Sequence, residues 1–146
     1  MFASAQKAVY QDTYELTNVV HSDGQSHRKV LLIDEQAHVL RVVRLNLNRH
    51  GYEVEMAMSS ENALHMLQEN RYDVVIITSD LPDMSARKLC ELFELKVGSK
   101  CPLTLVGAVG NDSWIKQSLF AEKLEKPVSL RWIVARLSEA FGDFNK

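Results

Sequence analysis

Two adjacent carboxylates and one distant lysine are the residues of this sequence whose chemistry is hardest to explain by packing alone. Asp34 and Glu35 directly follow an apolar run at residues 30–33, and Lys126 precedes Pro127 near the end of the chain. Neighbouring carboxylates repel each other, and their hard oxygens suit a divalent cation such as Mg²⁺. The alternative is that either acid caps a following helix. An ammonium from Lys126 would neutralise such an acidic site with or without a bound metal.

The elements that would position these residues are indicated by short apolar runs that alternate with stretches of helical period from residue 29 onward. Such alternation is typical of repeated βα units around a parallel sheet. We expect strands at residues 30–33, 53–57, 74–78, 103–106 and 121–124. The first, third and fourth runs are apolar nearly throughout, as strands covered on both faces must be. The predicted fold is a three-layer α/β/α sandwich, with any site at the carboxyl ends of the strands.

Apolar stripes at helical spacing predict the helices between these strands. Gly51 suits the left-handed cap of the first helix, Ser60 is a candidate N-cap for the second, and Pro127 suits the first turn of the last. Asn111 or Asp112 is a candidate cap for a short helix before the fifth strand. The expected stripes are Leu40, Val43 and Leu47; Ala63, Leu64 and Leu67; Leu89, Leu92 and Phe93; Trp114, Ile115 and Leu119; and Leu130, Ile133, Val134 and Leu137.

The composition of the 146-residue chain, with 46% hydrophobic and 25% charged residues, is typical of one globular domain. A net charge of −2 with scattered basic residues disfavours direct nucleic-acid binding. The longest apolar runs are far shorter than a membrane span, and no signal-peptide pattern opens the chain. The spacing of Cys90 and Cys101 predicts free thiols. We therefore expect a cytoplasmic protein that contacts neither nucleic acid nor membrane.

Several short motifs together give the chain a family resemblance. They are VLLIDE at 30–35, GYEV at 51–54, AL at 63–64, YDVVII at 72–77, LPDM at 81–84 and EKP at 125–127. In this order and spacing the motifs resemble CheY-like response-regulator receiver domains over residues 29–142. The resemblance implies a flavodoxin-like (βα)5 fold with strand order 2-1-3-4-5. It also implies a non-enzymatic role in two-component, or phosphorelay, signal transduction.

The resemblance draws attention to Thr78. In such receivers a carboxylate at the end of the third strand accepts a phosphoryl group from a histidine kinase, with Mg²⁺ held by an acidic pair. Thr78 stands at that position here, four residues before Pro82. A threonine hydroxyl is a weak nucleophile without a nearby base, and it would form a stable ester rather than a labile acyl phosphate.

Two further positions depart from the family pattern, and three match it. Gly107 stands where receivers carry the hydroxyl residue that contacts the phosphoryl group, and Lys123 stands where an aromatic residue reports that contact. Asp34, Glu35 and Lys126 match the family and would keep the charges of its pocket. The resemblance therefore implies a pocket that has lost its acceptor, its sensor and its reporter.

Asp80 has two interpretations. It lies two residues past Thr78, ahead of Leu81 and Pro82. The simpler interpretation is a solvated loop residue. In the other, Asp80 points into the pocket, where it completes a weak Mg²⁺ site with Asp34 and Glu35 or serves as a displaced acceptor. In neither case does the sequence require a cofactor.

The favoured hypothesis is a phosphorylation-independent receiver, a pseudo-receiver, that acts as a protein-interaction or dimerisation module. One alternative is an active receiver phosphorylated at Asp80. Another is a small flavodoxin-like protein that binds a nucleotide or flavin, although no G-x-G-x-x-G spacing supports it. The expected partners are a histidine kinase, an output domain or a second copy of the chain. Candidate anchors on the last helix, the fifth strand and the short fourth helix are Trp114, Phe120 and Trp132.

The domain organisation expected from the sequence has three parts. Residues 1–28 are polar and end in a turn-rich stretch, so we interpret them as an extension or linker that is either a short amphipathic helix or a frayed tail. Residues 29–142 form the receiver domain, and residues 143–146 form a tail.

Overall fold

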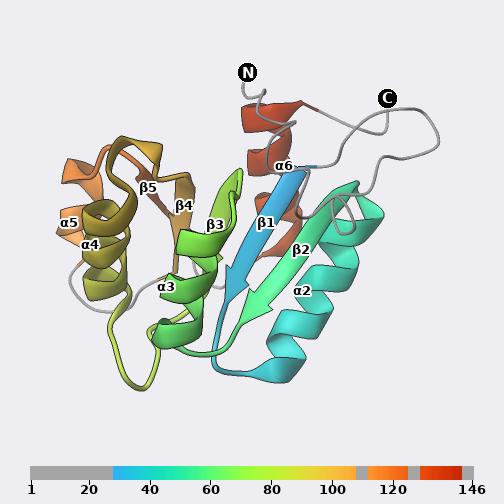
Figure 1. Ribbon diagram of the computed structural model, residues 1–146. Coiled ribbons are helices and arrows are strands. Elements are labelled where there is room, and N and C mark those ends of the chain that lie inside the picture. The colour runs from blue at the N-terminus through green and yellow to red at the C-terminus, as the bar shows by residue number, and fades with distance from the viewer. Residues whose placement is uncertain (1–27, 108–111, 125–128, 143–146) are drawn as a thin grey trace.

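Five parallel strands form one sheet in the order β2-β1-β3-β4-β5 (Figure 1). The computed structural model describes residues 28–107, 112–124 and 129–142. The extension predicted at residues 1–28, apart from Arg28, and the tail at 143–146 lie outside these residues. The strands are β1 (Arg28–Ile33), β2 (Tyr52–Ala57), β3 (Val74–Ile77), β4 (Leu103–Val106) and β5 (Ala121–Lys123). The predicted sheet and its strand order are confirmed.

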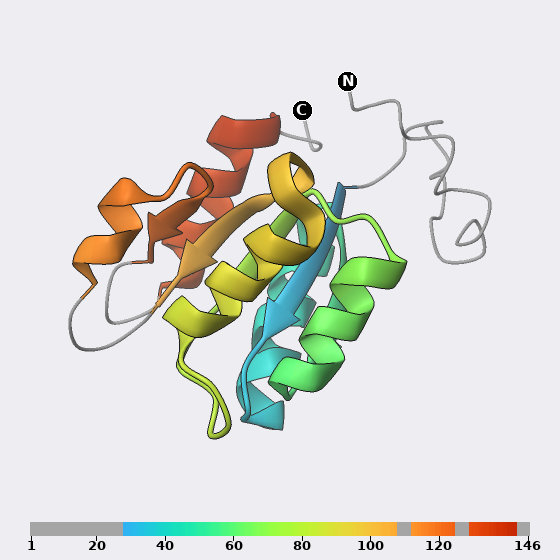
Figure 2. The ribbon, with the colours of Figure 1, turned by 60° about the vertical axis from the view of Figure 1, so that its left-hand side comes forward.

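Helices cover both faces of the sheet, which gives the three layers expected from the sequence (Figures 1 and 2). One face carries α3 (Ser60–Glu69), α4 (Ala86–Val97) and the short α5 (Ser113–Gln117). The other carries α2 (Ala37–Arg49) and α6 (Leu130–Phe141), while a 3-10 turn, η2 (Gly98–Lys100), follows α4. Successive strand residues alternate between the two cores, so that Leu31 belongs to the first and Leu32 to the second.

Local signals explain where the helices begin and end. Gly51, with a φ of 92°, ends α2 in a conformation that favours glycine, as predicted. The prediction of Ser60 as the N-cap of α3 is wrong, because Ser59 accepts the capping hydrogen bond from the backbone N–H of Asn62. The Ser60 hydroxyl instead donates to the carboxylate of Asp83 in the loop after β3. That loop is thereby tied to the start of α3.

The region of α5 differs most from the sequence prediction. The backbone N–H groups of Phe120 and Ala121 both donate to the hydroxyl of Ser118, which ends α5 after only five residues. Leu119 is consequently 97% exposed, so its assignment to a buried stripe is wrong. Leu92 is also only partly buried, whereas Leu89 and Phe93 of the same predicted stripe lie in the core.

Candidate functional site

Asp34 and Thr78 are directly hydrogen-bonded at the carboxyl end of the sheet. Each residue follows the last residue of its strand, β1 or β3, and these two strands are neighbours. Asp34 is 5% exposed and Thr78 is 4% exposed. The Thr78 hydroxyl donates to Oδ2 of Asp34 and lies 3.4 Å from the carbonyl oxygen of Ile33. A charge-assisted hydrogen bond therefore joins the two positions.

The second carboxylate oxygen of Asp34 is used by the chain as well. Oδ1 of Asp34 accepts a 2.8 Å hydrogen bond from the backbone N–H of Gln36. Both oxygens therefore receive donors from the protein itself. The adjacent acid, Glu35, is exposed. The two neighbouring carboxylates that the sequence grouped together thus occupy different environments, one buried and one in solvent.

Asp80 is half-buried and contributes to the start of α4. Its Oδ1 accepts a 2.7 Å hydrogen bond from the backbone N–H of Ala86, the first residue of that helix. Ser85 caps the same helix by accepting from the backbone N–H of Lys88 at 3.1 Å. A carboxylate near a helix N-terminus is favoured by the unpaired N–H groups and by the helix dipole. The geometry gives Asp80 a structural role that needs no ligand.

Gly107, directly after β4, closes the site on a third side. Its backbone N–H donates to the carbonyl oxygen of Ile77 at 2.7 Å. A Cβ atom at this position would lie 2.8 Å from the carbonyl oxygen of Thr78 and 3.3 Å from a side-chain carbon of Leu124. Glycine is therefore required here by the close approach of the backbone.

Lys123 ends β5 in a charged contact at the surface. Its ammonium lies 3.0 Å from Oδ2 of Asp112, the residue before α5. The hydrogen bond and charge of Lys123 lower the pKa of Asp112. On the other side, Glu122 accepts two hydrogen bonds from Arg136 of α6, at 2.6 and 2.5 Å. Adjacent residues of β5 therefore link the strand to α5 and to α6.

Lys126 and Ala108 lie outside the residues that the structure describes. The contact expected between the Lys126 ammonium and Asp34 therefore stays a prediction. Within the described ranges, no three His, Cys, Asp or Glu side chains gather as they would around a metal ion. Asp34, Glu35 and Asp80 in particular do not form such a group.

The three aromatic candidates do not form one cluster. Trp114 and Phe120 are half-buried, pack against the core that α3 and α4 cover, and line a shallow groove between α4 and α5. Trp132 packs instead against the core on the opposite face of the sheet. The exposed Leu119 lies next to Phe120. An interface built on all three aromatic residues would have to extend around the β5 edge.

A buried charge cluster that the sequence analysis missed lies at the amino end of the sheet. Lys29 of β1 is 0% exposed, and its ammonium lies 3.2 Å from Glu55 and 5.5 Å from the centre of the Tyr72 ring. The Tyr72 hydroxyl donates to the same carboxylate at 2.5 Å. Burial lowers the pKa of Lys29 and raises that of Glu53, its strand partner, to about 7. This cluster could have been found in the sequence from Glu53 and Glu55, which alternate along β2 beside Lys29 of the neighbouring strand.

A comparison with known protein families identifies the family of this chain. The model of the response regulator receiver domain matches residues 30–138, which include every described strand beyond the start of β1. This chain belongs to the response-regulator receiver family. Receiver domains are signalling modules rather than enzymes, so the non-enzymatic role predicted from the sequence is supported by membership of this family.

Curated relatives of this receiver include transcriptional regulators. The regulatory protein KdpE of Mycobacterium tuberculosis is 34% identical over 114 residues, which make up 76% of this chain and 50% of KdpE. The probable transcriptional regulator ycf27 of Guillardia theta is 28% identical over 127 residues, covering 85% of this chain and 49% of that protein. The receiver described here thus spans about half the length of these relatives.

Solved receiver structures share the fold. A CheY-like receiver from Methanospirillum hungatei has a TM-score of 0.68 and 22% identity, with 79% of this chain and 94% of that chain covered. The chemotaxis regulator CheY4 of Vibrio cholerae has a TM-score of 0.67 and 24% identity, with 79% and 99% covered. None of the helices in the described part of this receiver has the length and apolar character of a membrane span.

Receiver domains typically bind Mg²⁺ at the acceptor site. The residues described here do not fit that ion well. Thr78 offers a neutral hydroxyl and no anionic oxygen, and its proton is already directed at Asp34. The remaining Asp34 oxygen accepts from Gln36, and Glu35 is exposed. A hard cation prefers several anionic or carbonyl oxygens free to face it.

Proposed function

We propose that this receiver transmits its signal through protein contacts and without accepting a phosphoryl group. The observation that carries the proposal is the hydrogen bond from the Thr78 hydroxyl to the buried carboxylate of Asp34. An acyl phosphate requires a carboxylate at the acceptor, whereas a phosphoryl group on the Thr78 hydroxyl would form a stable ester, and this hydroxyl is buried and already bonded to Asp34. Two other positions support the proposal. Gly107 has no hydroxyl with which to contact a phosphoryl group, and its close packing leaves no room for one. Lys123 is not aromatic and forms an ion pair at the surface, so it is not suited to report such a contact.

The partner in this proposal is a protein. The named relatives are transcriptional regulators, and this chain spans about half their length. We therefore propose a histidine kinase, an output domain or a second copy of the receiver as the partner, in the cytoplasm. The proposed surface comprises α5, β5 and α6, which the ion pairs of Lys123 and Glu122 hold together. The receiver unit comprises residues 29–142 in this scheme, preceded by the extension.

Any affinity for Mg²⁺ is expected to be weak under this proposal. Asp34 is the only buried acid of the proposed acidic pair, and both of its oxygens are already hydrogen-bonded within the part of the chain that the structure describes. A cation would have to displace at least one of these donors. No step of the proposed function passes through the metal.

A second candidate function is phosphorylation at Asp80. Its carboxylate is half-buried and close in sequence to Thr78, but Oδ1 holds the start of α4. Phosphorylation would remove that negative oxygen from the Ala86 N–H and would weaken the first turn of the helix.

The test combines a phosphodonor with two variants. The purified protein is incubated with Mg²⁺ and acetyl phosphate and analysed by intact mass with and without hydroxylamine, which cleaves acyl phosphates. We expect no labile adduct on the wild type or on Asp80→Asn. An adduct on the wild type that disappears in Asp80→Asn would establish the second candidate. An adduct that persists in that variant would contradict both.

A further inference from the structure

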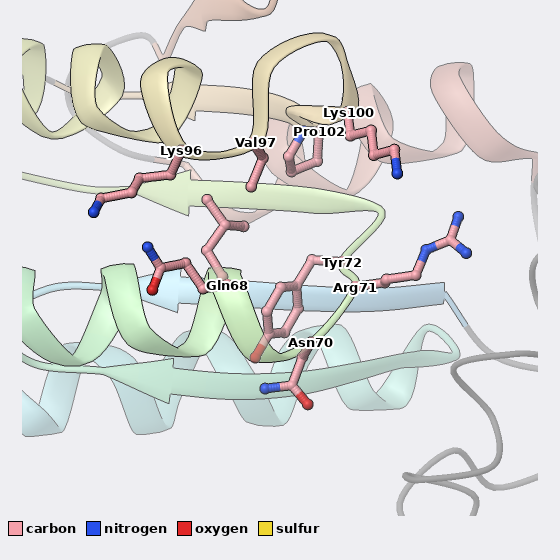
Figure 3. A pocket seen from close by; sticks show the side chains of 9 residues that line it. Gln68, Asn70, Arg71, Tyr72, Lys96, Val97, Lys100 and Pro102 are labelled. Carbon is pink, nitrogen blue, oxygen red and sulfur yellow. The ribbon is translucent and has the colours of Figure 1, made fainter.

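A cavity of about 600 Å³ lies at the amino ends of β3 and β4, away from Asp34 and Thr78 (Figure 3). Its lining comes from the end of α3 with the loop before β3, and from the end of α4 with the segment before β4. A cavity of this size is within the range of sites that hold small molecules. Its position separates it from the acceptor edge of the sheet.

Positive charge dominates the rim of the cavity. Arg71, Lys96 and Lys100 are exposed and come from three different segments of the chain. None of the nine described lining residues is Asp or Glu. In Figure 3 the side chains of Arg71 and Lys100 extend toward the same end of the cavity, and Lys96 extends toward the other. The net charge of the whole chain is −2, so this local excess of cations runs against the average.

The floor of the cavity is apolar and largely buried. Leu67 and Tyr72 are buried, at 5% and 9% exposure, and Val97 is half-buried beside them. The Tyr72 ring is fixed by its 2.5 Å hydrogen bond to Glu55, which in turn pairs with Lys29. A ligand would therefore meet a preformed aromatic and aliphatic surface with cations at its two ends.

Helix electrostatics account for only part of this arrangement. Lys96 lies in the last turn of α4, where a cation complements the helix dipole without any ligand. Arg71 lies two residues beyond Glu69, the last residue of α3, where the effect of that helix dipole has already fallen off. The position of Arg71 and Lys100 at the same end of the cavity, beside a buried aromatic floor, is what points to a ligand.

We propose that this cavity binds a small phosphorylated compound, whose phosphate groups contact Arg71 and Lys100 and whose less polar body rests on Tyr72 and Leu67. Arginine and lysine are the residues that most often hold phosphate oxygens, by bidentate hydrogen bonds and by charge respectively. This inference does not depend on the proposed function, because the cavity and the Thr78 site share no residue.

The experiment measures binding of ADP, pyrophosphate and adenosine to the isotope-labelled full chain by amide chemical shifts, in a buffer free of phosphate and Mg²⁺. We expect ADP to shift the amides of Arg71, Tyr72 and Lys100, pyrophosphate to bind more weakly, and adenosine not to bind. The affinity for ADP should fall about tenfold in Arg71→Gln and in Lys100→Gln, and it should fall with added salt. Lys88→Gln, an equal charge change on an exposed position of α4 outside the cavity, should leave the affinity unchanged.

Each other outcome would overturn the proposal. The absence of ADP and pyrophosphate binding at about 5 mM would mean that the cavity takes no phosphorylated compound of useful affinity. Adenosine binding equal to that of ADP would remove the role of the phosphates. Shifts confined to the residues around Asp34, or equal losses of affinity in Lys88→Gln and Lys100→Gln, would show that the cavity is not the site.

Discussion

The backbone of Gly107 passes so close to Thr78 that a Cβ atom on Gly107 would lie 2.8 Å from the Thr78 carbonyl oxygen. The ends of β3 and β4 can pack this closely only because Gly107 has no side chain. A hydroxyl residue at position 107 and the present backbone are mutually exclusive, because real Cβ atoms do not approach an oxygen so closely.

Gly107→Ser is therefore expected to destabilise the fold. The new side chain forces β3 and β4 apart, and overpacking of this kind costs about 1–3 kcal/mol of unfolding free energy. Urea denaturation followed by circular dichroism measures the loss. Ala135→Ser, at an exposed position of α6, is the control and should change the unfolding free energy little. Equal stability of the two variants would contradict the close approach.

Thr78→Asp is expected to make the stability of the protein depend on Mg²⁺. The substitution removes the hydrogen bond to Asp34 and brings a second buried carboxylate next to it, and like charges at this distance repel. The melting temperature should fall without Mg²⁺ and recover when it is added. Thr78→Val removes the same hydroxyl without adding charge, so its melting temperature should not respond. A wild type that Mg²⁺ stabilises as strongly as it stabilises Thr78→Asp would show that the native pocket already holds the ion.

Glu53 gives the protein a pH dependence near neutrality. Burial raises its pKa to about 7 from the ordinary 4.5, against the opposing charge of Lys29. Because the folded state holds this proton more tightly than the unfolded state, the stabilisation is complete below pH 4.5 and is lost as the pH rises through 7. The partial exposure of Glu53 reduces the effect to about 1–2 kcal/mol.

The measurement for Glu53 compares unfolding free energies between pH 5 and pH 8. Glu53→Gln should flatten the decline over this window, whereas Glu61→Gln, at an exposed position of α3, should leave it as in the wild type. Parallel curves for the wild type and Glu53→Gln would assign the decline to other groups.

The aromatic residues of the proposed surface are expected to contribute to association. Phe120→Ala and Trp132→Ala should each weaken self-association or partner capture about tenfold or more, because aromatic residues concentrate interface energy. Both side chains also pack partly on the core, so circular dichroism must show a retained fold. Leu119→Ala removes an apolar side chain of the same surface that is 97% exposed, so it tests association without removing core packing. Unchanged association in all three folded variants would remove this surface from the proposal.

The fold could be predicted because apolar periodicity reports burial directly. The uninterrupted runs ending at Ile33 and Ile77 indicated central strands, and the structure buries both runs on two faces. The strand prediction at residues 74–78 was one residue too long. The Thr78 N–H still donates to Ile33, but β1 ends there and offers no further partner.

The contacts of the site could not be predicted, because they join residues far apart in the chain. Ser60 and Asp83 were assigned to separate local motifs, and nothing in their neighbourhoods indicates their hydrogen bond. Lys29 is the second residue of β1, where a lysine is normally exposed, and its burial depends on Glu55 and Tyr72 from other elements. The roles of Thr78 and the other pocket residues remain predictions.

The two outer strands of the sheet limit how copies of this protein can associate. β5 has only three residues, so it presents few backbone groups to an added strand. β2 is longer, but a second copy added there would remove water from the partly exposed polar side chains of Glu53 and Glu55 on one of its faces. Continuation of the sheet from one molecule into the next is therefore disfavoured at either margin. A pair of these molecules would meet through helices and side chains, with each sheet kept separate.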